Sequence, residues 1–453
     1  MRKRGLLALL GAVTTMALAA TAASAEPFHI LVGGHTAQPP TLSFCQANYG
    51  IACYGPPQIE QAYDMKPLYR AGLNGAGKTI VIVDSYGSPT IQSDLQTFDQ
   101  AYGLPAPPHF DIITPDGPVT QNENDPTGTT QGWGVETTLD VEYSHAMAPG
   151  ANILLVETPV AETEGIGGIP QMVQAENYVI DHRLGDVITQ SWGATEQTFA
   201  SPQQLLSQRS AYENALLHNV SVLASSGDTG AADYEFDGSD LYPFPAINWP
   251  ASDPLVTAVG GLELHLDNNG FRTQPDNVWN DPTPPCGSQP CAGSGGLSSV
   301  FSRPFYQDGV RYVVGNRRGM PDVSLNAAVS SAVNIYLSFL PGMPGFWEPI
   351  AGTSEASPLF SGIVAVADQA AHHDLGLLNP RLYQLGDGFR SPIDDITLGN
   401  NTVTWVQPST KQTITVQGYS AVPGYDLASG LGTPDGARLV AELAGFRQDQ
   451  LRR

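Results

Sequence analysis

The chain has 453 residues, of which 41% are hydrophobic and 14% are charged, and its formal net charge is -24 at pH 7. The composition excludes a disordered chain, because enough apolar residues are present to build a large core. The acidic excess argues against nucleic acid and anionic membranes as partners, since both are polyanions, and it fits an acidic habitat.

The N-terminus has the three parts of a secretory signal peptide. Residues 2–4 are basic, residues 6–20 are mostly apolar, and residues 23–25 form a small-residue cleavage site. We therefore predict removal of residues 1–25, a mature chain that starts at Glu26, and secretion. The removed segment contains three basic and no acidic residues, which leaves a mature charge of -27. No later stretch has the run of about 20 apolar residues that a membrane span needs.

The four cysteines form two close pairs, Cys45 with Cys53 and Cys286 with Cys291. In a secreted chain such pairs predict two local disulfides. A zinc site is less favoured, because neither a Cys-x-x-Cys motif nor a pair of histidines accompanies them.

Residues 26–57 are rich in Pro, Gly and Cys, which predicts an irregular N-terminal arm. A helical pattern follows at 58–71. After it, apolar β-branched runs alternate with helical patterns. The predicted strands are 78–84, 152–157, 187–192, 220–225 and 255–259. The predicted helices are 91–102, 135–147, 169–183, 202–219 and 437–444. This alternation indicates an α/β fold, with a mostly parallel sheet, helices on both faces and ligands at the carboxyl ends of the strands.

Two further segments are rich in loops. Residues 271–290 are polar and Pro-rich, and we expect an insertion that carries the second disulfide. Residues 394–435 are rich in Asp, Gly and Asn. Neither segment indicates a second domain.

A candidate nucleophile lies in Gly-Thr-Ser-Glu-Ala-Ser-Pro, residues 352–358, before the small apolar run 359–371. A glycine turn, a serine and then a helix would hold the Ser354 hydroxyl at a helix N-terminus, where unpaired N–H groups and the helix dipole favour an oxyanion. The alternative is that Ser354 only caps a buried helix. A nucleophile also needs a base, an orienting partner and a second oxyanion donor.

Glu136 and Asp140 stand at positions i and i+4, on one face of a predicted helix with no cation placed to pair with them. Like charges stacked in this way raise one pKa and make a shared proton plausible. The alternative is an exposed acidic helix.

Asp228 lies in Ser-Ser-Gly-Asp-Thr-Gly, residues 225–230, directly after a predicted buried strand. A side chain there reaches the carboxyl edge of the sheet. The alternative is an ordinary turn that ends the strand.

Together these residues resemble the sedolisin family, serine-carboxyl peptidases that share the subtilisin fold but replace its histidine. The resemblance rests on E-x-x-x-D at Glu136 and Asp140, S-S-G-D-x-G at 225–230 and G-T-S-x-x-x-P at 352–358, in the family's order. Supporting stretches are 145–150, 191–193, 249–254, 295–298 and 321–324. The resemblance covers about residues 58–445 and implies a peptidase domain there, with a tail at 446–453.

The resemblance implies a subtilisin-like three-layer fold and an endopeptidase that acts on polypeptides. Ser354 would be the nucleophile, Glu136 the general base, and Asp140 the acid that orients it. Asp228 would be the oxyanion donor. Because a carboxylate repels an oxyanion, Asp228 can donate only while protonated, so we expect activity in acid.

The resemblance also implies one Ca²⁺ ion, bound by Asp395 and Asp426 with the backbone carbonyls of Ile396, Val422 and Gly424. Carboxylates and carbonyls are the oxygen ligands that calcium prefers. Val422 departs from the family, which usually has glycine there, but a carbonyl ligand does not depend on the side chain.

A second departure is at the front of the chain. The family usually carries a long propeptide, whereas about 32 residues separate Glu26 from residue 58. Self-processing is therefore not part of what the resemblance implies. We expect a monomer with polypeptide substrates and no nucleic acid or membrane partner.

Three alternatives stay open. An ordinary subtilase would use Asp84, His145 and Ser354, but the His-Gly-Thr helix start that it needs is absent. A secreted binding protein on an inactive peptidase scaffold would have lost a catalytic residue, and none is lost. Glycosidase chemistry fits poorly, because carboxyls one helical turn apart on one face cannot flank a sugar bond from both sides.

Overall fold

The computed structural model describes residues 30–446 except 33, 121–124, 126–127, 282–288 and 387–389. The predicted signal peptide, the start at Glu26 and all of the predicted tail except Phe446 lie outside the described residues. None of the described helices is long and apolar enough to cross a bilayer.

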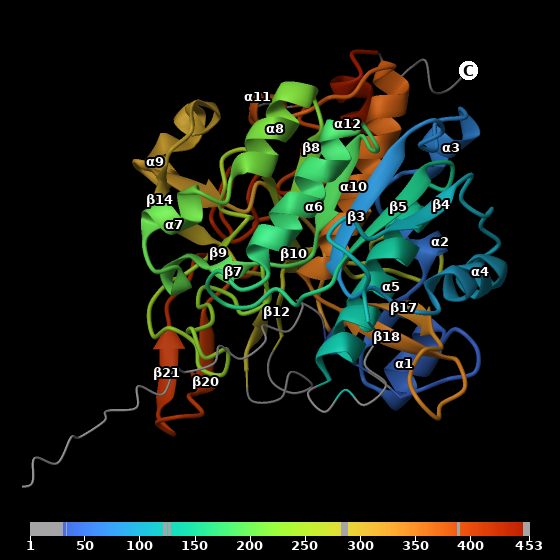
Figure 1. Ribbon diagram of the computed structural model, residues 1–453, viewed down its shortest axis with the longest axis horizontal. Helices are drawn as coiled ribbons and strands as arrows, with labels where there is room; N and C mark the ends of the chain where they lie inside the picture. The colour runs from blue at the N-terminus through green and yellow to red at the C-terminus, as the bar shows by residue number, and fades with distance from the viewer. Residues whose placement is uncertain are drawn as a thin grey trace, which may run out of the picture.

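An eight-stranded sheet runs through the middle of the molecule (Figure 1). Its order is β11 (Asn277–Val278), β10 (Thr257–Glu263), β8 (Ser221–Ser225), β6 (Val187–Gln190), β3 (Thr79–Ser85), β5 (Asn152–Thr158) and β4 (Phe110–Ile113), and β16 (Val323–Asn326) also pairs with β10. All neighbours are parallel except β10 and β11. The mostly parallel sheet predicted from the sequence is therefore confirmed.

Strand β3 shows why these runs are continuously apolar. Ile80 and Ile82 belong to the core on one face of the sheet, and Val81 and Val83 belong to the core on the other. Because successive side chains of a strand point to opposite faces, a strand covered on both sides must be apolar at every position.

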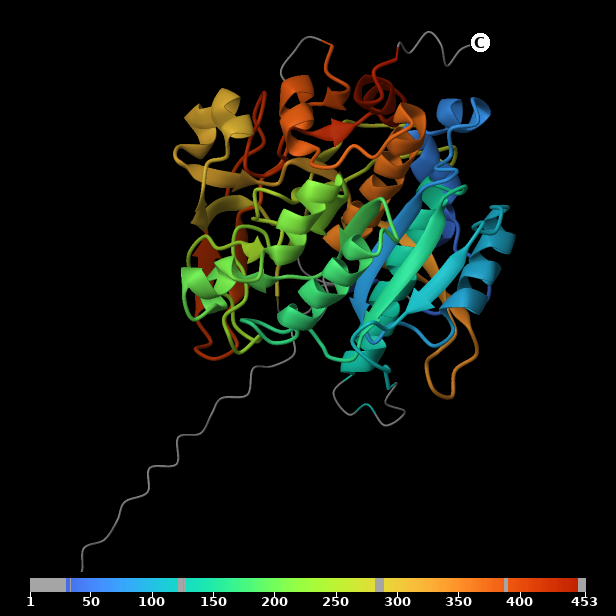
Figure 2. The same ribbon diagram turned by 45° about the horizontal axis from the view of Figure 1, so that its top comes forward.

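Helices cover both faces. α5 (Thr129–Met147) and α10 (Thr353–Ala371) pack together on one face, and α6 (Ile169–Asp181) and α8 (Ser210–His218) pack on the other. Figures 1 and 2 show α6 and α8 in front of the sheet and α10 behind it. α4 (Ile91–Tyr102) contacts α5, and α12 (Gly436–Leu443) contacts α10. This is the three-layer arrangement that the sequence predicts.

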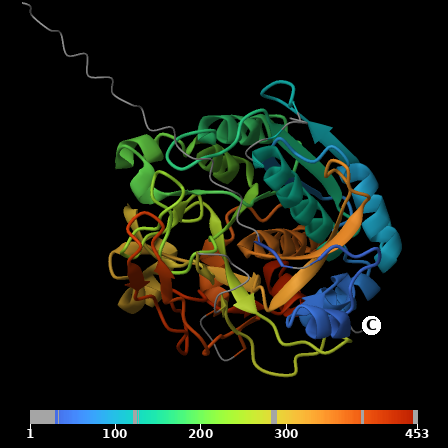
Figure 3. The same ribbon diagram turned by 90° about the horizontal axis from the view of Figure 1, so that it is seen from below.

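A second sheet of four strands carries the chain to the predicted nucleophile. Its order is β1 (Ile30–Leu31), β18 (Phe346–Ala351), β17 (Ser331–Leu337) and β2 (Ala52–Tyr54). Figure 3 shows its orange part beside the teal helix α5 and close to the blue part of the chain. The predicted irregular arm at 26–57 therefore differs from the structure, since it contains β1, α1 (Leu42–Asn48) and β2. Long-range pairing with β17 and β18 creates these strands.

Two predicted helices are divided. Residues 58–71 form parts of α2 (Pro56–Ala62) and α3 (Lys66–Arg70), because Asp64 between them has a φ of 52°. Residues 202–219 form α7 (Pro202–Leu206) and α8. The last predicted strand begins two residues late, at Thr257 in β10, and continues to Glu263.

The remaining elements are short and lie around the sheet. They are β7 (Ala194–Thr195), β9 (Asn248–Trp249), β12 (Asn280–Asp281), β13 (Cys291–Ala292), β14 (Gly296–Ser302), α9 (Arg311–Val314), β15 (Arg317–Met320), α11 (Asn379–Gly386), β19 (Ile393–Asp394), β20 (Val403–Val406), β21 (Thr413–Val416), β22 (Thr433–Pro434), and the 3-10 helices Glu196–Thr198 and Phe305–Val310.

The Cys45–Cys53 disulfide is present, as predicted. Cys291 is disulfide-bonded as well. Its predicted partner, Cys286, lies outside the described residues.

Candidate active site

The predicted nucleophile lies where β18 turns into α10. Gly352 makes this turn with a φ of 139°, a conformation that residues with a Cβ rarely adopt. The helix begins at Thr353, so Ser354 lies in its first turn and is not the N-cap. Ser354 is fully buried, and its Oγ has no hydrogen-bond partner among the described residues. Its backbone N–H is one of the first-turn donors that an α-helix leaves unpaired.

Pro358 is the sixth residue of α10 and has no N–H to give to the carbonyl of Ser354, four residues earlier. The hydroxyl of Ser191 lies 3.5 Å from that carbonyl oxygen and donates a hydrogen bond of 2.8 Å to Asp140 Oδ1. Ser191 therefore joins the turn that bears Ser354 to the carboxyls of α5.

Three buried carboxyls gather beside this turn. Glu136 and Asp140 come from α5, and Asp84 comes from the carboxyl end of β3. Each is fully buried. Burial raises the pKa of Asp140 well above its usual range, and the charges of Asp84 and Glu136 raise it further. Burial and Glu136 likewise raise the pKa of Asp84, which accepts a hydrogen bond of 2.9 Å from Thr137. Like charge and burial together favour the protonated forms of Asp84 and Asp140.

Asp228 lies at the carboxyl end of β8, next to the start of α10. Its Oδ1 accepts two hydrogen bonds from Thr353, from the N–H at 2.8 Å and from the hydroxyl at 2.7 Å. Its Oδ2 has no partner among the described residues. Burial raises the pKa of Asp228 well above its usual range, and the Glu136 charge adds to this. A protonated Oδ2 is therefore the available donor of this carboxyl.

The structure thus brings all four predicted catalytic residues into one region. Asp228 bonds to the residue before Ser354, Ser191 joins Asp140 to the Ser354 carbonyl, and the charge of Glu136 acts on both Asp140 and Asp228. Three neighbours were not given a role by the sequence: Ser191, Thr353 and, outside the ordinary-subtilase alternative, Asp84. The signal for Asp84 was its position at the end of a buried strand.

His145 does not take the place that an ordinary subtilase requires. Its Nε2 lies 2.8 Å from the Pro105 carbonyl oxygen and 3.2 Å from Asp99 Oδ1. The imidazole therefore faces the end of α4 and the loop that follows it. Asp84 accepts a hydrogen bond from Thr137 instead. The geometry gives no support to a Ser-His-Asp triad of Asp84, His145 and Ser354.

The predicted calcium ligands lie in one loop region. Gly424 N–H donates to Asp395 Oδ2 and Val422 N–H donates to Asp426 Oδ2, each at 2.9 Å, so both carboxyls close on the same loop. Two carboxylates with backbone carbonyls form an all-oxygen set that suits a hard cation. No cluster of three or more His, Cys, Asp or Glu side chains able to hold a metal occurs in the described part of the chain. The calcium site stays a prediction.

Comparison with known proteins decides the family. The model of the subtilase family matches residues 119–383, which is more than half of the chain. The chain belongs to the subtilase family. This subtilase is 32% identical over 396 residues to kumamolisin from Bacillus sp. (strain MN-32), covering 86% of this chain and 63% of the relative. It is 28% identical over 390 residues to sedolisin from Pseudomonas sp. (strain 101), covering 86% and 61%.

A solved structure supports the same family. Pseudomonas sedolisin, described as a serine-carboxyl proteinase in complex with two molecules of pseudo-iodotyrostatin, matches with a TM-score of 0.70 and 26% identity, over 87% of this subtilase and 99% of that chain. The sedolisin family and the subtilisin-like fold predicted from the sequence are therefore confirmed. The subtilase spans a little over three fifths of the length of kumamolisin and sedolisin.

Proposed function

We propose that the chain is a secreted serine-carboxyl endopeptidase that hydrolyses polypeptides in acid. The observation that carries the proposal is the placement of Asp228, which bonds twice to Thr353 through Oδ1 while Oδ2 has no partner among the described residues. A buried carboxyl with a raised pKa, held next to the nucleophile, is the kind of donor that an oxyanion needs. The kinship with sedolisins supports it.

Each of the four residues has a step in this mechanism. Glu136 accepts the Ser354 Oγ proton while Oγ forms a bond to the carbonyl carbon of the substrate. The oxyanion accepts hydrogen bonds from protonated Asp228 and from the Ser354 N–H. Glu136 then gives its proton to the leaving amine as the C–N bond breaks. A water then gives a proton to Glu136 as its oxygen bonds to the acyl carbon, and Glu136 passes that proton to Ser354 Oγ as the C–Oγ bond breaks. Asp140 keeps Glu136 oriented throughout.

The expected pH dependence follows from Asp228. Burial raises its pKa, so the donor proton is held from strong acid up to a pH above the usual range of a carboxyl and is lost as pH rises further. The base requires an ionised carboxyl while the donor requires a protonated one, so the working window closes at both ends and lies in acid.

The same proposal includes one calcium ion held by Asp395, Asp426 and the carbonyls of Ile396, Val422 and Gly424. Calcium there would stabilise the folded state and would add no chemistry at Ser354. We further propose a monomer with no nucleic acid or membrane partner, secreted after removal of residues 1–25, with 58–445 as the peptidase domain.

The proposal is tested by the pH profile of protein hydrolysis by the mature chain beside its Ser354→Ala and Asp228→Asn variants. We expect an acidic optimum, no activity in Ser354→Ala, and an alkaline limb that moves upward in Asp228→Asn, because the amide donates at every pH. A wild-type optimum at neutral or higher pH contradicts the mechanism. An unmoved limb in Asp228→Asn would assign that limb to Glu136 and Asp140.

A further inference from the structure

A second group of buried carboxyls lies beside the active site and has no part in the steps above. Glu162 and Glu164 follow β5, and Asp233 follows β8. Their residues are 1%, 2% and 1% exposed. The burial of these three carboxyls needs a structural reason, because a buried charge without a partner is costly.

Glu164 and Asp233 meet at Thr195. Glu164 Oε2 accepts hydrogen bonds from the Thr195 N–H at 2.9 Å and the Thr198 hydroxyl at 3.0 Å, and its Oε1 lies 3.5 Å from the Thr195 hydroxyl. Asp233 Oδ1 accepts from the Tyr234 N–H at 3.0 Å, and the carboxyl also lies against the hydroxyls of Thr195 and Thr229. The Thr195 side chain therefore lies between the two carboxyls.

The groups that face this pair are acidic or neutral: Glu162, Glu196, Asp228 and Tyr242. Burial raises the pKa of Asp233 to about 7. Burial and the Asp233 charge raise the pKa of Glu164 well above its usual range. In acid Glu164 and Asp233 are both neutral. Once the pH rises above their raised pKa values, they would become two buried negative charges on either side of the Thr195 hydroxyl.

The pair joins the two segments that carry active-site residues. Thr195 is four residues after Ser191, in β7, and Asp233 is five residues after Asp228. β7 pairs with β9, where the Asn248 amide donates to the Ser226 carbonyl at 2.7 Å. The segments 191–198 and 226–236 are thus held to each other through Thr195, Asp233 and β9.

We propose that Glu164 and Asp233 are positioning residues that form a proton-dependent brace between segments 191–198 and 226–236. Neutral, the carboxyls hold the segments together and keep Asp228 against Thr353. Ionised, they repel each other, and Asp228 loses its place. The inference rests on the proposed peptidase function for its consequence, but the brace can be measured without activity.

The first test is hydrogen exchange of the Ser354→Ala variant from about pH 4 to about pH 8, with rates corrected for the intrinsic pH dependence of exchange. We expect protection of 191–198 and 226–236 to fall as pH rises through about 7, the pKa of Asp233, while α10 stays protected. Adding Glu164→Gln should delay the fall to higher pH. Protection that is constant with pH, or that is lost equally throughout the chain, overturns the brace.

The matched control is Glu176→Gln. Glu176 is a fully buried carboxyl on α6 whose oxygens have no partner among the described residues, and burial raises its pKa as well. Its removal should leave the pH at which the two segments lose protection unchanged. The same shift in Glu176→Gln as in Glu164→Gln would show a general effect of buried charge and would overturn the proposal.

The second test is the pH profile of kcat/KM for Glu164→Gln and, independently, Asp233→Asn. A brace predicts that the alkaline limb moves upward in both by about one unit, the size of effect that removing a nearby like charge produces. If Asp233 only adds its charge to Asp228, its removal lowers the pKa of Asp228 and moves the limb downward, which contradicts the brace. Inactive wild-type protein with intact pH-dependent protection would instead refute only the peptidase function.

Discussion

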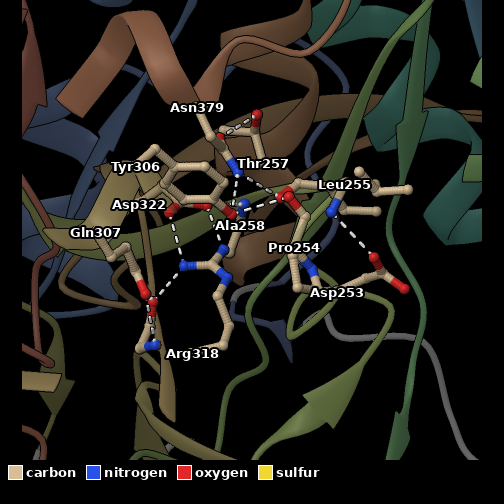
Figure 4. A network of polar contacts seen from close by, with 12 residues as sticks. Asp253, Pro254, Leu255, Thr257, Ala258, Tyr306, Gln307, Arg318, Asp322 and Asn379 are labelled. Carbon is tan, nitrogen blue, oxygen red and sulfur yellow. Dashed lines mark hydrogen bonds and ion pairs between the residues drawn. The ribbon is translucent and has the colours of Figure 1, made fainter. Parts of the chain in front are cut away.

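Arg318 in β15 and Asp322 just before β16 form a buried ion pair, whereas the carboxyls around Ser354 raise one another's pKa by their like charges and accept hydrogen bonds from neutral donors. The two terminal guanidinium nitrogens donate to Asp322 at 2.8 and 2.5 Å, and Asp322 also accepts from the Ala258 N–H and the Tyr383 hydroxyl, each at 2.8 Å. Figure 4 shows the guanidinium facing this carboxylate in a network of polar side chains.

The difference between the two regions is in what pH can change. Arginine stays protonated at any working pH, so Asp322 always has a cation beside it. Around Ser354, burial raises the pKa of Asp84, Asp140 and Asp228, so these carboxyls hold their protons to a higher pH than exposed carboxyls do. The first arrangement makes a fixed scaffold, and the second makes a site that depends on protons.

The largest expected effect is on the proton-dependent region. Ser354→Ala and Glu136→Ala should each lower kcat by at least about 10³-fold, because the proposed mechanism uses both residues in the same covalent step. Asp140→Asn should lose less, since the amide keeps the shape of the site. Initial rates on an unfolded protein substrate in acid measure this, with far-UV circular dichroism as the control for folding. Near wild-type turnover in either alanine variant would remove Ser354 or Glu136 from the mechanism.

The next largest effect is expected when the buried ion pair loses its cation, so that Asp322, like the carboxyls around Ser354 in the described part of the chain, has no arginine beside it. Arg318→Met should cost about 3–5 kcal/mol of unfolding free energy at neutral pH, because Asp322 is left as an uncompensated buried charge. The loss arises because a buried carboxylate without its cation is costly to keep away from water. Urea unfolding at neutral pH measures it, and an unchanged free energy of unfolding would contradict this account.

A third arrangement is a pair of carboxylates that a metal would neutralise. Chelation of calcium should lower the melting temperature, since an ion at 100 times its Kd stabilises the folded state by about 2.7 kcal/mol. The measurement belongs at near-neutral pH, because protons compete for Asp395 and Asp426 in acid. Asp395→Asn is the control and should reduce the response to chelator. A melting curve that ignores chelator at that pH would exclude the site.

The smallest effect is expected from replacing a single buried carboxyl, Glu176, and it is an effect on stability. Burial raises the pKa of Glu176 well above 4.5, so its contribution to stability is complete below that pH and is lost as pH rises toward the folded-state pKa. Glu176→Gln should match the wild type in acid and become the more stable protein above it, by about 1.4 kcal/mol for each pH unit over that range. Thermal unfolding at several pH values tests the slope, and parallel stability curves would refute it.

The sequence by itself determined the class of fold and the candidate residues. The spacing of apolar residues is local, so it predicted β3, β5, β6, β8 and α4 closely, and the order of three short motifs predicted the sedolisin family. Ser354, Glu136, Asp140 and Asp228 could be chosen in this way because each lies in a motif whose chemistry is local. Their catalytic roles remain predictions.

Tertiary structure alone decided which groups meet. Asp228 and Thr353 are 125 positions apart, Ser191 and Asp140 are 51 apart, and no periodicity encodes such contacts. The strands β1 and β2 were missed because their pairing with β17 and β18, not their own composition, makes them strands. The pKa of Asp233 and the pairing of Arg318 were equally out of reach, because burial and the surrounding charges belong to the packed molecule and not to the residue.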